Sequence, residues 1–205
     1  MTISLSDTGK RFNREWIFRK LNYQFKAGNS YAITGPNGSG KSTLLQIIGG
    51  AVTHSEGTIS YNLDGKPLEP DAVYRQLSIA APYLELIEEM TATEFLQFHQ
   101  GFKPLLQGHS IPAILGEVGL EKAAHKQIRY FSSGMKQRLK LAQAIFSDCQ
   151  LLLLDEPCTN LDAPGIGIYQ TLISSYSNNR LIIVSSNDPQ EYGFCTEILR
   201  IQDFK

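Results

Sequence analysis

The sequence has little cysteine and no long hydrophobic run. Its three cysteines, Cys149, Cys158 and Cys195, lack the even count and close spacing of a disulfide framework or a zinc site. We therefore expect three small, buried, apolar side chains. No apolar stretch approaches the roughly 20 residues that cross a bilayer, and the opening residues MTISLSDTGKRF lack the apolar segment of a secretory signal. These absences predict a cytoplasmic protein with no direct membrane span.

The sequence also lacks an excess of charge of either sign. The chain has 19 basic and 20 acidic side chains and a formal net charge of -1, so no basic surface suited to nucleic acid or anionic lipid is indicated. What is present is an ordinary hydrophobic content of 42% in 205 residues, enough for a globular core.

Short, almost wholly apolar runs indicate a parallel sheet. The runs SYAIT (30–34), LLLLD (151–155) and LIIVS (181–185) are typical of strands that are covered on both faces. Such strands require crossover helices, and helical patterns begin near Lys41 and Pro164. The sequence therefore predicts an α/β fold.

Two other regions have different patterns. WIFRKLNYQF and GTISYNLDGKP, with a turn at Asp64 and Gly65, predict a small antiparallel sheet. Between about Thr91 and Ser147 the pattern becomes helical, and Thr91 with Glu94 three residues later forms a capping-box signature. We expect a helical insertion in an α/β core.

A glycine-rich loop lies directly between the SYAIT strand and a helix. Its pattern, Gly-x-x-x-x-Gly-Lys-Ser, is that of a phosphate-binding loop, in which backbone N–H groups and a helix N-terminus surround phosphate oxygens. We expect Lys41 to bridge the β- and γ-phosphates of a nucleotide and the Ser42 hydroxyl to bind Mg²⁺. The predicted phosphate-contacting residues are Gly35, Pro36, Asn37, Gly38, Ser39, Gly40, Lys41, Ser42 and Thr43.

Two adjacent carboxylates lie at the end of the LLLLD run: Asp155 is its last residue, and Glu156 follows directly. Asp155 stands where the strand emerges and is predicted to hold Mg²⁺, while Glu156 is predicted to point in a different direction, by alternation along an extended chain, and to act on an attacking water. A water-positioning glutamate beside a metal-binding aspartate favours ATP hydrolysis over phosphoryl transfer to a hydroxyl acceptor.

The segment YFSSGMKQR supplies a second candidate anion site. Ser132, Ser133 and Gly134 are small residues at a helix N-terminus, where free N–H groups and a positive helix end favour an anion. This segment resembles the LSGGQ signature of ATP-binding cassette (ABC) ATPases. Phe131 takes the place of the leucine and Met135 that of the glutamine.

The resemblance covers essentially the whole chain and implies the ABC-ATPase version of the P-loop NTPase fold, mainly a parallel sheet core with a small antiparallel β subdomain and a helical insertion. It also implies a single ABC ATPase domain over 1–205. The parts of this domain are a nucleotide-binding core with the antiparallel β part at 1–80, a helical subdomain with the signature at 81–147, and core again with the acidic strand and the switch strand at 148–205. In this family two cassettes pack head to tail, and each signature closes on the ATP that the partner holds.

The resemblance also implies roles for single residues. Phe12 falls where the family stacks an aromatic ring on adenine, and Trp16 is the second candidate for that role; the alternative is that Phe12 belongs to the core of the small sheet. Asp162, in TNLD, matches a carboxylate at the dimer interface. Pro82 stands in place of a glutamine that contacts Mg²⁺ and water, and Asn187 in place of the switch histidine, where its amide can still donate to the γ-phosphate.

The function implied is that of the ATP-binding and hydrolysing subunit of a compact, exporter-like ABC transporter. Its partners would be a second cassette, identical or paralogous, and separate transmembrane permease subunits that hold it at the inner face of the cell membrane, with docking near Tyr83, Leu86 and Phe95. Hydrolysis is expected to be slow in isolation. The alternative is a soluble ABC-type switch that dimerises with ATP and turns over little.

Overall fold

The computed structural model describes residues 1–177 and 179–205. The chain forms two compact units. Unit 1 consists of Met1–Leu77, Gln150–Asp155 and Asn179–Lys205, and unit 2 consists of Ser78–Cys149 and Glu156–Asn178. Glu156–Asn178 therefore groups with the helical unit, whereas the resemblance implied that all of 148–205 belongs to the core.

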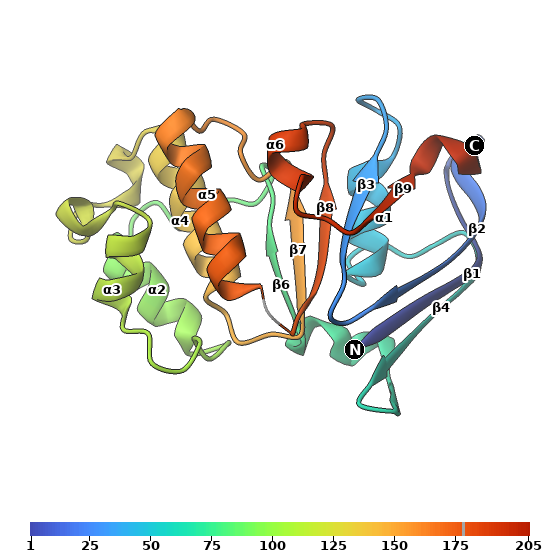
Figure 1. Cartoon of the computed structure of the whole chain (residues 1–205), viewed down its shortest axis with the longest axis horizontal. Helices are drawn as coiled ribbons and strands as arrows, with labels where there is room; N and C mark the ends of the chain where they lie inside the picture. The colour runs from blue at the N-terminus through green and yellow to red at the C-terminus, as the bar shows by residue number, and fades with distance from the viewer. Residues whose placement is uncertain (178) are drawn as a thin grey trace. The chain divides into compact units, whose positions relative to one another are not determined.

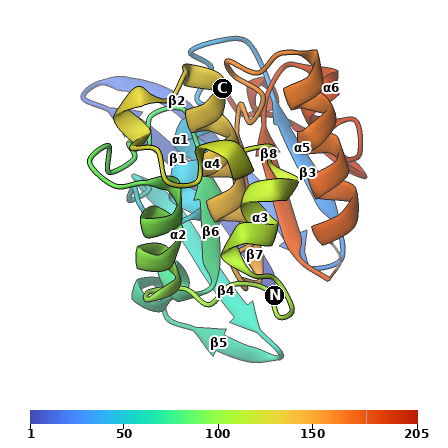
Figure 2. The same cartoon turned by 90° about the vertical axis from the view of Figure 1, so that its left-hand side faces the viewer.

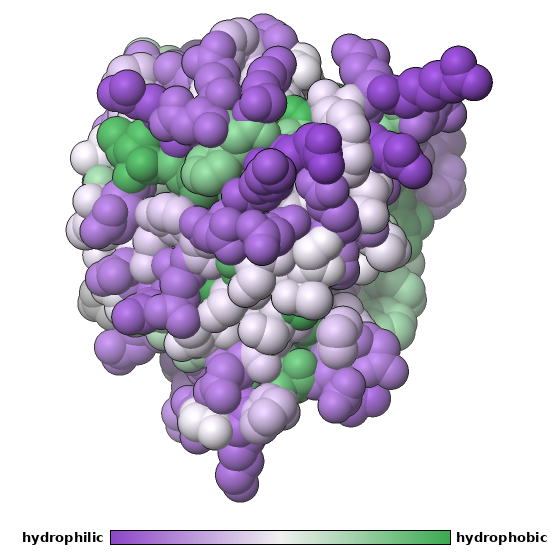
Figure 3. All heavy atoms as spheres, turned by 90° about the vertical axis from the view of Figure 1, so that its right-hand side faces the viewer, coloured by the Kyte–Doolittle hydropathy of each residue, from purple (hydrophilic) through white to green (hydrophobic). Residues whose placement is uncertain are grey.

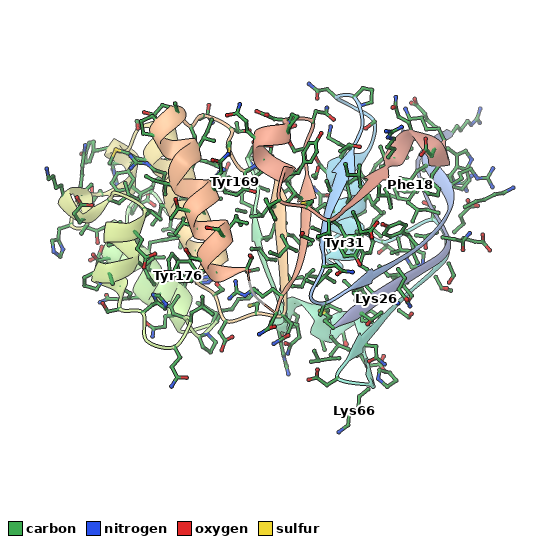
Figure 4. All side chains as sticks on the ribbon, viewed as in Figure 1. Phe18, Lys26, Tyr31, Lys66, Tyr169 and Tyr176 are labelled. Carbon is green, nitrogen blue, oxygen red and sulfur yellow. The ribbon has the colours of Figure 1, made fainter. Side chains whose placement is uncertain are left out.

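Unit 1 contains the small antiparallel sheet. Its strands have the order β2-β1-β4-β5 and are β1 (Thr2–Phe12), β2 (Glu15–Lys26), β4 (Glu56–Leu63) and β5 (Lys66–Leu68). The predicted turn is present between β4 and β5, with φ of 51° at Asp64 and 81° at Gly65. Lys66 begins β5 and points away from the sheet (Figure 4). The long polar strand β1 was not expected from the sequence.

The parallel sheet of unit 1 confirms the three apolar runs. β3 (Ser30–Thr34), β7 (Leu151–Asp155) and β8 (Leu181–Ser185) coincide with them, and β9 (Glu197–Arg200) pairs with β3, so that the order of these four strands within the sheet is β7-β8-β3-β9 (Figure 1). Neighbouring strands pair in parallel. Because parallel strands carry their carboxyl ends to one edge, the residues after β3, β7 and β8 meet there.

Helix α1 (Lys41–Ile48) packs on this sheet against β7 and β8. A Cβ atom at Gly49, just after the helix, would lie 3.0 Å from Leu153 Cδ1, so Leu153 points toward α1. Tyr61 of β4 donates a hydrogen bond to the Ile48 carbonyl (3.1 Å) at the end of α1. The remaining helical elements of unit 1 are η1 (Pro70–Arg75), α6 (Pro189–Tyr192) and η4 (Ile201–Phe204).

Aromatic side chains join the strands in the interior of unit 1. Phe18 and Phe25 of β2 are fully buried, and the Phe25 ring lies 5.0 Å from Tyr31 of β3 in an edge-on arrangement (Figure 4 labels Phe18 and Tyr31). The face shown in Figure 3 is mainly hydrophilic, with hydrophobic atoms in small separate groups.

Unit 2 is mainly helical. Strand β6 (Leu77–Ala80) leads into it, and its helices are α2 (Ala92–Gln100), α3 (Ile111–Glu117), η2 (Glu121–Ala123), η3 (Ile128–Tyr130), α4 (Ser133–Ile145) and α5 (Ala163–Tyr176) (Figure 2). The predicted capping box at the start of α2 is confirmed, since Thr91 and Glu94 bond to each other's backbone.

The core of unit 2 lies between α4 and its neighbours. Leu139, Ala142 and Ile145 of α4 are buried, as their spacing predicted. On α5, Tyr169 is fully buried and Tyr176 donates a hydrogen bond to Glu117 (2.6 Å) (Figure 4). Cys149 and Cys158 are buried as expected, but Cys195 of unit 1 is partly exposed.

Candidate nucleotide-binding site

The loop between β3 and α1 has a backbone that needs glycine. Gly35, Gly38 and Gly40 have φ of 150°, 76° and 103°. A Cβ atom at Gly40 would lie 2.2 Å from Ile17 Cγ2, and one at Gly35 would lie 2.8 Å from both Ile201 Cγ2 and Ser39 Oγ. Strain and space therefore both exclude larger residues at Gly35 and Gly40.

The start of α1 favours an anion. Gly40 is the N-cap and offers no side chain to the helix, and the first turn carries no acidic residue. The N–H of Leu44 closes the first turn on the Gly40 carbonyl (2.9 Å). The N–H groups before it are those that a helix leaves without intrahelical partners, and the positive end of the helix dipole adds to them.

The Lys41 side chain is buried and reaches back to the carbonyl groups of the phosphate loop. It is 5% exposed, and its Nζ donates to the carbonyls of Gly35 (2.9 Å) and Pro36 (3.4 Å). These are neutral acceptors, so an arriving phosphate could replace them with a stronger charge-assisted bond. Ser39 Oγ is also buried and has no hydrogen-bond partner within the part of the chain that the structure describes.

Asn187 lies at the same loop. Its Oδ1 accepts a hydrogen bond from the Gly35 N–H (3.0 Å), and its Nδ2 donates to Asn37 Oδ1 (3.4 Å). Asn187 follows β8, whose neighbour β3 leads into the loop. The amide is thus held beside the first residue of the phosphate loop.

Asp155 lies at the carboxyl edge of the parallel sheet. It is 2% exposed, and as the second residue after Leu153 it points to the same face, the one that α1 covers. Helix α1 begins at this edge, and Ser42 is in its first turn. A carboxylate and a hydroxyl are oxygen ligands of the kind that Mg²⁺ takes, so both fit a metal bound with a nucleotide phosphate.

Phe12 and Trp16 both stay candidates for stacking on a base. Phe12 pairs with Glu15 at the end of β1, and its ring is 50% exposed, with Lys10 Nζ 4.7 Å from the ring centroid. The Trp16 ring is covered by the Arg19 guanidinium at 4.0 Å. The register of β1 and β2 shifts beside Ile17, the residue that meets Gly40, so alternation along β2 does not decide between the two rings.

Glu156 begins the part of unit 2 that follows β7. Its φ of 43° is left-handed, which is uncommon for a residue other than glycine. The chain therefore turns sharply at Glu156, and this turn, rather than alternation along an extended strand as the sequence suggested, gives the side chain its direction. The Thr159 N–H donates to the Glu156 carbonyl (3.1 Å) and holds the turn.

The signature segment forms the exposed N-terminus of α4. Ser132 is the N-cap, and its hydroxyl accepts a hydrogen bond from the Met135 N–H (3.3 Å). Ser132 and Ser133 are exposed, whereas Phe131 is buried beneath them. A Cβ atom at Gly134 would lie 3.0 Å from the Asn160 carbonyl oxygen, so Gly134 allows the loop after Glu156 to pass close to the helix.

Sequence reasoning missed Gln137. Its side chain is 3% exposed, and Nε2 donates to the Pro157 carbonyl (2.7 Å), which ties the signature helix to the residue after Glu156. A polar residue on the buried side of α4 was the available signal. Nearby, Asp162 caps α5 by accepting the Gly165 N–H (2.9 Å) and remains exposed.

Pro82 has neither a side-chain polar atom nor an N–H to offer, but its carbonyl oxygen is engaged. Lys140 of α4 donates to it (3.0 Å) and approaches the Ala81 carbonyl (3.4 Å). Burial lowers the pKa of the Lys140 ammonium from its ordinary value, with the charge of Lys136 adding to the effect. The segment that replaces the family glutamine is thus fastened to the signature helix.

The comparison with protein families decides the identity. Residues 18–159 match the family described as ABC transporter. The chain belongs to the ABC transporter family. It is an ATP-binding cassette, and cassettes of this family are ATPases that hydrolyse ATP for transport.

Relatives and solved structures agree with this assignment. YybJ of Bacillus subtilis, an uncharacterized ABC transporter ATP-binding protein, is 29% identical over 92% of the cassette and 87% of YybJ. YxlF of the same organism, described in the same words, is 35% identical over 80% of the cassette, which spans only 55% of YxlF. The dimeric structure of MJ0796, a bacterial ABC transporter cassette, has a TM-score of 0.81 at 24% identity and covers 97% of the cassette and 94% of MJ0796, which supports the fold.

Among the described residues of the cassette, no helix is both long and apolar enough to span a bilayer.

Proposed function

We propose that the cassette is the ATP-binding subunit of an ABC transporter, and that it closes with a second cassette around two ATP molecules to move separate transmembrane subunits. The observation that carries this proposal is the exposed Ser132 turn at the N-terminus of α4, where a helix end favours an anion as the start of α1 does. The dimeric MJ0796 cassette supports the pairing. Asp162, exposed beside the signature, would lie at the same interface.

The roles of the site residues follow from their surroundings. Lys41 and the N–H groups at the start of α1 would bind the β- and γ-phosphates, and Phe12 would stack on adenine. Ser42 and Asp155 would hold Mg²⁺, which supplies charge neutralisation at the phosphates when it is bound. Glu156 would accept the proton of the attacking water, and Asn187 would donate to the γ-phosphate.

Pro82 and Asn187 lead us to expect a low rate of ATP hydrolysis, because they replace the glutamine and the histidine of the family pattern. Loss of one preorganised donor to transferring charge typically costs ~3 kcal/mol, or about a hundredfold in rate. Because Glu156 is retained, we expect slow turnover by the isolated cassette and faster turnover in the assembled transporter.

Steady-state ATP turnover tests the catalytic assignment. Glu156→Gln should abolish turnover and leave ATP binding intact, because the amide keeps the size of the side chain but cannot accept the proton. Glu89→Gln is the matched control, since the Glu89 side chain is 74% exposed and pairs only loosely with Arg129 at 3.8 Å. Equal rates for the wild type and Glu156→Gln would contradict the role of Glu156.

A cleft in unit 2 suits a permease segment. It has a volume of about 390 Å³ and is lined by Pro82, Leu86 and Lys136 among others. Tyr83 beside it is 46% exposed. Phe95, in contrast, is 6% exposed and belongs to the core, so it is removed from the predicted docking residues.

Co-purification in detergent tests this docking. The wild-type cassette should retain an integral membrane protein, and Leu86→Glu should lose it while binding ATP normally. Ile198→Glu on β9 is the control, because Ile198 is 56% exposed and lies in unit 1. Equal retention by both variants would place the docking surface elsewhere.

A soluble switch with little turnover is the second candidate. Two departures from the family pattern support this function. Pro82 has no side-chain polar atom, and Asn187 has an amide that bonds to the phosphate loop where the family has a titratable imidazole ring. ATP-dependent dimerisation without any membrane partner, together with negligible turnover, would favour the switch.

A further inference from the structure

Ser185, the last residue of β8, carries a buried hydroxyl that the roles above do not use. Ser185 is 0% exposed, and its Oγ has no hydrogen-bond partner in the part of the chain that the structure describes. Buried hydroxyls are nearly always bonded, and leaving one without a partner is costly. Such a group is therefore expected to gain a partner in another state of the protein.

The strand register identifies the neighbour. Ser185 is paired with Asp155 on β7 and with Ile33 on β3, and in a parallel sheet paired residues project from the same face. That face is the one covered by α1, because Leu153, two residues before Asp155, points to Gly49 at the end of α1. Ser185 and Asp155 are therefore neighbouring residues on the face that α1 covers, at the edge where α1 begins.

We propose that Ser185 is a positioning residue for Asp155, and that its hydroxyl donates a hydrogen bond to the carboxylate when Asp155 serves the metal of the bound nucleotide. Carboxylates that bind metals are themselves usually fixed by hydrogen bonds from neighbouring groups. A carboxylate has two oxygens, so one can serve the metal while the other accepts from Ser185. The inference rests on the proposed magnesium site.

The test compares nucleotide affinity with Mg²⁺ and with EDTA, using a fluorescent ADP analogue so that no turnover is involved. Ser185→Ala removes the hydroxyl, and Ser185→Cys keeps nearly the same shape with only a weak donor. In both variants the gain in affinity from Mg²⁺ should fall about fivefold, the change that corresponds to one hydrogen bond of ~1 kcal/mol. Affinity in EDTA should be unchanged.

Thermal unfolding of the nucleotide-free protein separates this role from a structural one. Because Ser185 Oγ has no partner in the described chain, Ser185→Ala should not lower the melting temperature. Ser78→Ala is the matched control, since Ser78 is 3% exposed and its hydroxyl donates to the Ala144 carbonyl (2.7 Å). Ser78→Ala should lower the melting temperature and leave the Mg²⁺ gain intact.

Three outcomes would overturn the inference. A full Mg²⁺ gain in Ser185→Ala would show that the hydroxyl does not serve Asp155. An equal loss of affinity with and without Mg²⁺ would indicate a general disturbance of the pocket. A wild-type protein without any Mg²⁺ gain would remove the proposed magnesium site itself, and the inference with it.

Discussion

Replacement of Gly40 by alanine probes the physical basis of the phosphate loop. Gly40 has φ of 103°, and an added Cβ atom would lie 2.2 Å from Ile17 Cγ2, far inside van der Waals contact. Gly38, in the same loop, has φ of 76°, but no atom of the described residues lies within 4 Å of a Cβ added there. The two glycines therefore separate backbone strain from steric exclusion.

The magnitudes follow from these contacts. Left-handed backbone at a residue with a Cβ atom costs ~1–2 kcal/mol, and forcing an extra methyl into a packed site costs ~1–3 kcal/mol more. Gly40→Ala should therefore lower the free energy of unfolding by about 2–5 kcal/mol, and Gly38→Ala by only ~1–2 kcal/mol.

Urea denaturation of the single variants and of Gly40→Ala combined with Ile17→Ala measures both terms. Truncation of Ile17 should recover the steric part, with a coupling energy of ~1–3 kcal/mol in the double-mutant cycle. Equal destabilisation by Gly40→Ala and Gly38→Ala, or additive effects of Gly40→Ala and Ile17→Ala, would show that Ile17 does not exclude a side chain at residue 40.

Further predictions concern unit 2. Gln137→Leu should cost about 1–3 kcal/mol in urea denaturation, because it leaves the buried Pro157 carbonyl without its donor at 2.7 Å; a cost near zero would contradict this. His99 should make stability fall as the pH drops. Burial lowers the pKa of His99 from 6.5 to about 4. As the pH falls, the imidazole is therefore protonated in the unfolded chain before it is protonated in the folded one, so the free energy of unfolding decreases between pH 6.5 and pH 4. His99→Asn should flatten the slope of unfolding free energy between pH 4 and 6.5, and an unchanged slope would exclude His99 as its source.

Much of the parallel sheet was readable from the sequence because its strands are buried on both faces. β3, β7 and β8 coincide with the apolar runs, and the glycine-rich loop lies where its motif required. Strand β1 was not predicted, since its polar residues and shifts in register hide the alternation that marks a strand.

Other features depend on contacts between distant segments. The turn at Glu156 has a left-handed φ that sequence patterns do not specify for glutamate. The grouping of α5 with the helical unit depends on packing between α4 and α5, which no local pattern encodes. The Ser185 hydroxyl has no hydrogen-bond partner among the described residues, and LIIVS alone does not reveal this, because it depends on strand register and burial.

We propose that two cassettes share each ATP through Ser132 at the start of α4. The molar mass in solution of the Glu156→Gln protein, with and without ATP and Mg²⁺, tests this pairing. We expect a monomer without nucleotide, a dimer with ATP, and loss of that dimer on adding Ser132→Arg while each chain still binds ATP. A protein that stays monomeric when saturated with ATP, or a dimer unaffected by Ser132→Arg, would contradict it.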